Sequence, residues 1–229
     1  MSSGDRAAPS PFPWARCITL ATLALLVLGL VWIADDPRLV KRLTRESGLV
    51  ENLTALLWAS CGVLCLACAT RANTARLNWL LGGVILLALA ARELDFQKRF
   101  TDWNLNNKGN YLDPEIPLVE RLGVLLLFAL PLAATGVAFL LRMWPQFREA
   151  WRQGLPWSRD IPLLLLMYLV AGRLDKIHHY GADLGIDMSY RFLYVGFEEV
   201  TELCVALLVA LTLLPAWRRA LRLGREGPQ

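Results

Sequence analysis

The residues best suited to chemistry are carboxylates and histidines at the edges of apolar stretches. Glu198 and Glu202 are four residues apart, so they share one face of a helix. Asp175 and His178 share a face in the same way, and His179 is adjacent. Two carboxylates this close repel each other unless a proton, an arginine or a metal ion lies between them. These spacings predict a site that binds a cation or exchanges a proton.

The apolar stretches beside these residues are too short to cross a bilayer by themselves. The stretches 161–172 and 203–214 contain twelve residues each, which cover about 18 Å as a helix. A hydrocarbon core about 30 Å thick needs roughly 20 residues. Both helices must therefore continue into their charged neighbours. An isolated charge below the membrane surface costs about 3 kcal/mol or more, so these residues should pair, face the bundle interior or bind an ion.

Further ionisable residues are expected on the same side of the membrane, because successive spans run in opposite directions. The ends of the third and fifth spans then face the same leaflet as the starts of the second, fourth and sixth. This arrangement assigns three roles. We expect Glu93, Asp175 and Glu198 to be catalytic, Arg92, Arg121 and Arg173 to hold substrate, and Glu51, His178, His179, Glu199 and Glu202 to bind a metal.

Three interpretations of this cluster stay open. The first is a structural ion-pair network in which the three arginines neutralise glutamates. The second is a metal site, and the third is a proton or ion relay in a transporter. Carboxylate and imidazole ligands from several helices would suit Zn, Fe or Mn. His178 and His179 diverge by about 100° on a helix, so one metal would use only one of them. Both share a face with Asp175, and the spacing does not choose between them.

The fold is expected to be an all-α polytopic membrane bundle. Of the 229 residues 55% are hydrophobic, against roughly 45–50% in soluble domains. Pro37–Val50 should hold a short interfacial helix, and Pro131 should kink the fourth span. Pro162 should begin a helix and Pro215 should end one. We expect six spans: 17–34, 53–70, 77–91, 122–141, one beginning at Ile161 and one ending at Leu214. The domains are then a mobile tail 1–15, a transmembrane domain 16–217 and a basic tail 218–229.

Several classes of function are disfavoured. The net charge is only +4, and no stripe of basic and aromatic residues predicts a nucleic-acid partner. The five cysteines are an odd number and lie in apolar stretches, which argues against a disulfide framework. Cys61, Cys65 and Cys68 share a helical face and should pack against a neighbouring helix. No Gly-x-Ser-x-Gly motif occurs, and no cysteine lies near the histidines.

The expected partners are the lipid bilayer and, in one alternative, another membrane protein. With both termini on one side, the 24 Lys and Arg divide equally between the two faces. Arg92, Arg121 and Arg173 are at span ends and should pair within the protein. Discounting them favours cytoplasmic termini in a bacterial inner membrane.

Four motifs carry a resemblance. They are Glu46-Ser47-Gly48-Leu49-Val50-Glu51, Arg92-Glu93-Leu94-Asp95, the Asn-rich stretch 104–110, and Glu198-Glu199-Val200-Thr201-Glu202. Over 46–214 the chain resembles a loose group of bacterial multi-pass inner-membrane proteins that have no assigned activity. It departs from them at 94–97, where the group often carries Ser-Trp-Gly-Gln. The resemblance implies the architecture and no chemistry.

Overall fold

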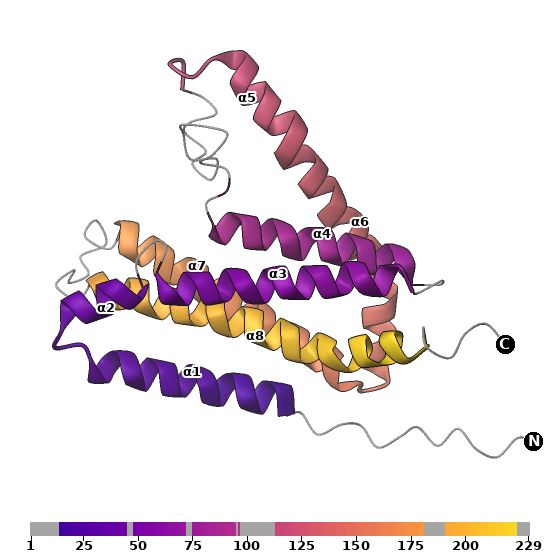
Figure 1. Ribbon diagram of the computed structural model, residues 1–229, viewed down its shortest axis with the longest axis horizontal. Helices are drawn as coiled ribbons and strands as arrows, with labels where there is room; N and C mark the ends of the chain where they lie inside the picture. Colours follow the sequence, from indigo (N-terminus) through magenta and orange to yellow (C-terminus); the bar gives the residue numbers. More distant parts are fainter. Residues whose placement is uncertain are drawn as a thin grey trace, which may run out of the picture. The chain divides into compact units, whose positions relative to one another are not determined.

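The computed structural model describes residues 14–44, 48–71, 75–94, 96, 113–180 and 191–223 (Figure 1). Within these residues every regular element is a helix, so the predicted all-α fold is confirmed. The elements are α1 (Trp14–Trp32), α2 (Pro37–Thr44), α3 (Leu49–Ala69), α4 (Arg76–Glu93), α5 (Leu118–Val124), the π-helix η3 (Leu125–Ala129), α6 (Leu130–Arg152), α7 (Pro156–Tyr180) and α8 (Arg191–Leu223).

The chain divides into two units. The first unit contains residues 1–44 and 145–212, and the second contains 45–144 and 213–229. The first unit therefore holds α1, α2, α7 and most of α8, while the second holds α3, α4, α5 and most of α6.

The core of the first unit joins α1, α2 and α8. Leu30, Val40 and Val200 are buried together, with 6%, 0% and 2% of their surface exposed. Gly196 lets α8 approach closely, since a Cβ there would lie 3.2 Å from Leu30 Cδ1. The end of α1 thus packs near the start of α8. Figure 1 shows the two helices running in opposite directions.

The short helix α2 confirms the helix predicted within 37–50. Asp36 caps it, because its Oδ1 accepts hydrogen bonds from the backbone N–H groups of Arg38 and Leu39 at 3.0 and 3.1 Å. Val40 then faces the core, while Leu39 is 39% exposed. The apolar side of this short helix therefore packs against α1 and α8, while its other side is exposed.

The second unit is built on close contact between α3 and α4. A Cβ on Gly62 would lie 2.7 Å from Leu87 Cγ, and one on Gly83 would lie 2.8 Å from Leu66 Cδ2. Each added Cβ would also be 3.1 Å from the carbonyl oxygen of the opposite glycine. The two backbones can approach this closely only because both positions lack a side chain.

Near Pro131, where the sequence predicts a kink, the helix contains a π-helical segment. The backbone N–H of Leu130 bonds to the carbonyl of Leu125, five residues earlier, in place of the usual four. Proline has no N–H to donate, and its ring crowds the preceding turn, which favours a local change of register. The helical path nevertheless continues from Leu118 to Arg152.

Two predictions about prolines are wrong. Pro162 lies inside α7, which begins at Pro156, and Pro215 lies inside α8, which continues to Leu223. Each proline removes only one i→i−4 hydrogen bond, and Trp217 beyond Pro215 is 5% exposed, so the helix stays packed past this proline.

Four segments are long and apolar enough to cross a membrane. They are Trp14–Trp32, Pro37–Ala69, Leu118–Arg152 and Arg191–Arg218. The third exposes large apolar side chains along its length, with Val119 83%, Leu127 73% and Leu141 71% exposed. Such a surface is unfavourable in water and suits a lipid environment. The helices α4 and α7 are outside this set, because charged residues lie close to both ends of their apolar parts.

Candidate functional site

The three glutamates near residue 200 lie on one uninterrupted helix. Because α8 continues from Arg191 to Leu223, its apolar part extends directly into the acidic turn. Twenty residues, or about 30 Å, separate Glu198 from Arg218. A bilayer core of about the same thickness would put both near its two surfaces, with Glu202 one turn inside. Glu198, Glu199 and Glu202 are half-buried, and each takes part in a hydrogen bond or electrostatic interaction.

The second group of predicted residues lies on the last turns of α7. This helix runs without a break through Arg173 and the following residues to Tyr180. Arg173 is exposed. The side chains of Asp175, His178 and His179 are outside the described residues, so their proposed roles stay predictions.

A buried ion pair at the beginning of α7 was missed by the sequence analysis. Asp160 is 6% exposed, and its Oδ1 lies 2.7 Å from Arg16 Nε on α1. The N–H does not point well at that oxygen, so the contact is an ion pair more than an aligned hydrogen bond. The Thr212 hydroxyl on α8 donates to the other carboxylate oxygen at 3.3 Å. The sequence contains two signs of this pair. Asp160 comes directly before the apolar stretch 161–172, and Thr212 is the single threonine in the apolar stretch 203–214.

Asp160 directly precedes the apolar stretch of α7 and contacts two other helices. Arg16 on α1 and the Thr212 hydroxyl on α8 both stabilise its charged form, because an opposite charge and a donated hydrogen bond favour a carboxylate. The group joins three helices at one end of the first unit.

The contact between Asp160 and Thr212 also gives one point at which α7 and α8 are at the same level. Figure 1 shows the two helices running in opposite directions, and only ten residues connect them. Asp175 is fifteen residues beyond Asp160, or about 22 Å along α7. Glu198 is fourteen residues before Thr212, or about 21 Å along α8. For two straight antiparallel helices, this count would bring the backbones at 175 and 198 to nearly the same level.

The remaining predicted residues belong to the second unit. Glu51 is half-buried in the first turn of α3, and Arg121 is half-buried in α5. Arg92 Nη2 lies 2.8 Å from Oε1 of its neighbour Glu93, whose side chain is 6% exposed. This pair is of the kind that the structural ion-pair interpretation predicts. The single cluster predicted from five helices combines residues of both units and stays a prediction.

The structure provides no complete metal-ligand group among the side chains that it describes. In that part of the chain no three residues of the types His, Cys, Asp and Glu lie together so that they could hold an ion. The five cysteines are all free thiols. Cys61, Cys65 and Cys68 are buried, as their shared face predicted. The Asn-rich stretch 104–110 is outside the described residues.

Comparison with known proteins identifies no relative. No protein-family model matches the sequence, and neither a curated protein nor a solved structure is similar to it.

Proposed function

We propose that this chain is a multi-pass membrane protein that binds one divalent metal ion where α7 ends and α8 begins. The metal would serve a reaction on a lipid-linked or small substrate at the outer face of a bacterial inner membrane. Six helical crossings and cytoplasmic termini complete the proposal.

The membrane part of the proposal is supported by four apolar segments that are long enough to span. Two further crossings would be α4 and α7, of 18 and 25 residues, since the first covers about 27 Å and the second about 38 Å. Both lengths are close to or above the thickness of a hydrocarbon core. Their charged ends would then lie at or just below the membrane surface, where pairing within the bundle stabilises them.

The observation that supports the metal site is the Asp160–Thr212 hydrogen bond, which brings α7 and α8 together at one level. Counted along straight helices from that contact, Asp175 would be level with Glu198. His178 and His179 follow Asp175 by three and four residues, so their backbones would be about one turn further along α7. Glu202 is about 6 Å deeper along α8 and fits better as a proton acceptor than as a ligand of the same ion.

The chemistry follows from this donor set. Two carboxylates and one imidazole suit Zn, Fe or Mn and leave coordination positions open for water or substrate. A metal bound there would polarise a substrate oxygen or lower the pKa of a bound water. Arg173 is exposed at the same level and would bind an anionic group of the substrate.

The competing function is a non-catalytic membrane subunit stabilised by ion pairs. The Arg92–Glu93 pair favours it for the end of α4, since this arginine already has a carboxylate partner. A proton-coupled transporter is the other alternative, with the half-buried Glu202 as its proton site.

Elemental analysis of the purified full chain in detergent tests the proposal. Wild type should retain about one metal ion per chain, and Glu198→Gln and His178→Ala with His179→Ala should each lose it. Glu115→Gln is the matched control, because Glu115 is an exposed carboxylate outside the site. Metal-free wild type, or equal metal content in all variants, would refute the metal site. Metal-free protein that moves protons across vesicles in a Glu202-dependent way would favour the transporter.

A further inference from the structure

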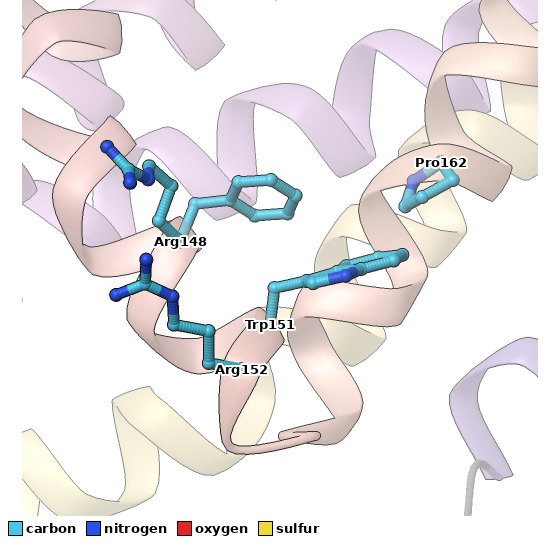
Figure 2. Close-up of a pocket in the computed structure, with 5 residues that line it drawn as sticks. Arg148, Trp151, Arg152 and Pro162 are labelled. Carbon is cyan, nitrogen blue, oxygen red and sulfur yellow. The ribbon is translucent and has the colours of Figure 1, made fainter.

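A second candidate site lies where α6 turns into α7, within the first unit. Gly154 makes this turn possible with a φ of +67°, a conformation that favours glycine. An open cavity of about 320 Å³ lies beside the turn (Figure 2). Its lining residues are Phe147, Arg148, Trp151, Arg152 and Pro162.

Two cationic groups lie at the edge of the cavity, whose own lining is almost entirely apolar. Arg148 and Arg152 are one helical turn apart and exposed, and Figure 2 shows both guanidinium groups extending to the same side. Neither has an ion-pair partner among the residues that the structure describes. The carboxylate of Glu149, between them in sequence, accepts a hydrogen bond from Gln153 Nε2 at 2.6 Å. Two unneutralised guanidinium groups at this spacing can bind one phosphate together.

Aromatic rings line the cavity. The ring centroid of Phe147 lies 5.8 Å from that of Trp151 and 6.4 Å from that of Trp157. Figure 2 shows the Trp151 ring extending toward Pro162, away from the two guanidinium groups. Trp151 is nevertheless 52% exposed. The cavity is therefore apolar inside, with two guanidinium groups at its edge.

We propose that an anionic phospholipid binds here, with its headgroup at the cationic edge and its apolar part in the cavity. The phosphate would contact Arg148 and Arg152, and the glycerol and upper acyl region would pack against Trp151. The site lies at the end of Leu118–Arg152, a segment apolar enough to span the membrane, so it would be at the level of the headgroups. Tryptophan prefers this level, and basic pockets between membrane helices bind anionic lipids there.

The charge around the turn supports an anionic ligand further. A Cβ on Gly154 would lie 3.3 Å from Arg159 Nη2, so a third guanidinium group lies beside the same turn. A neutral headgroup would gain little from three cations. An anionic one gains a factor of about five in affinity for each basic residue near it.

Lipid binding to the full chain in detergent, measured by native mass spectrometry, tests the proposal with short-chain phosphatidylglycerol and phosphatidylcholine. We expect wild type to prefer phosphatidylglycerol. The double variant Arg148→Gln with Arg152→Gln should bind it about 25-fold more weakly. Arg38→Gln with Arg42→Gln is the matched control, since these exposed arginines of α2 have the same spacing outside the cavity. It should change binding less than about twofold.

Two further variants separate the effect of charge from the effect of the aromatic ring. Arg148→Lys with Arg152→Lys keeps the charge and should retain most of the preference, whereas Trp151→Ala should weaken binding of both lipids. An equal loss in the α2 control would show that only overall charge matters and would refute the site. Full competition by millimolar inorganic phosphate would show that the cavity binds free phosphate and not a lipid.

Discussion

The close approach of α3 and α4 predicts opposite effects for the same substitution at two adjacent glycines. At Gly83, alanine would bring its Cβ to 2.8 Å from Leu66 Cδ2 and 3.1 Å from the Gly62 carbonyl oxygen. At Gly82, the only neighbour of the new Cβ within 4 Å is Phe139 Cε2 at 3.5 Å, an ordinary contact. Both residues are in the interior of α4, so the helix-propensity gain is the same for both.

The expected magnitude follows from two terms. Glycine to alanine inside a helix contributes up to about 1 kcal/mol of stability. Overpacking a close contact costs about 1–3 kcal/mol, and the Gly62 carbonyl belongs to a backbone that cannot rotate away. Gly82→Ala should therefore raise the free energy of unfolding or leave it unchanged. Gly83→Ala should be less stable than Gly82→Ala by about 1–3 kcal/mol.

Unfolding of the detergent-solubilised chain by increasing SDS, followed by circular dichroism, provides the assay. Adding Leu66→Ala to Gly83→Ala should recover part of the loss in a double-mutant cycle, because it removes the nearest clashing atoms. Recovery should be incomplete, since the backbone carbonyl stays. Equal stability of the two single variants would refute the proposed packing of α3 against α4.

Three other predictions test separate parts of the structure. Val40→Ala should lower the free energy of unfolding by about 1–2 kcal/mol, because the side chain is fully buried; the half-exposed neighbour Leu39→Ala should change it by less than about 0.5 kcal/mol. Asp160→Asn should lower the free energy of unfolding by about 1–3 kcal/mol, because it removes one partner of a buried ion pair; equal stability of wild type and variant in SDS unfolding would contradict the pairing. Leu127→Asp should reduce membrane insertion in a translocation assay by about 3 kcal/mol, since Leu127 is 73% exposed on an apolar helix; unchanged insertion would argue that this surface does not face lipid.

The helices were largely predictable from the sequence, because long apolar stretches leave few alternatives to a helix. The limits of α1 and α3 differ from the predicted spans by one to four residues at each end. The short helix α2 was also foreseen. The errors concern Pro162 and Pro215, where tertiary packing overrides a local preference that the sequence shows clearly.

The contacts between helices were much less predictable. Gly62 and Gly83 are ordinary membrane-helix residues in the sequence, and only the register of α3 against α4 makes them a pair. Asp160 was not singled out, since its partners Arg16 and Thr212 are far away in the chain. The residue pattern along one helix predicts its length and its apolar face. Contacts between helices that are far apart in the chain depend on how the helices are aligned with each other, which the pattern does not show.

For the candidate site, too, the sequence predicts features of single helices better than contacts between helices. The glutamates on α8 are half-buried, and their position below the membrane surface stays a prediction. Which of these acids meet each other depends on the pairing of α7 with α8. The single Asp160–Thr212 contact is the point from which the proposed ligand set is counted.

The most direct test of the central claim is a cross-linking measurement on that register in native membranes. In a cysteine-free background, Asp175→Cys with Glu198→Cys should cross-link through a short bifunctional maleimide, since both backbones would be at one level. Asp175→Cys with Thr212→Cys should not, because about 22 Å of helix separates their levels. Efficient linkage of the second pair without the first would contradict the register and remove the proposed metal site with it.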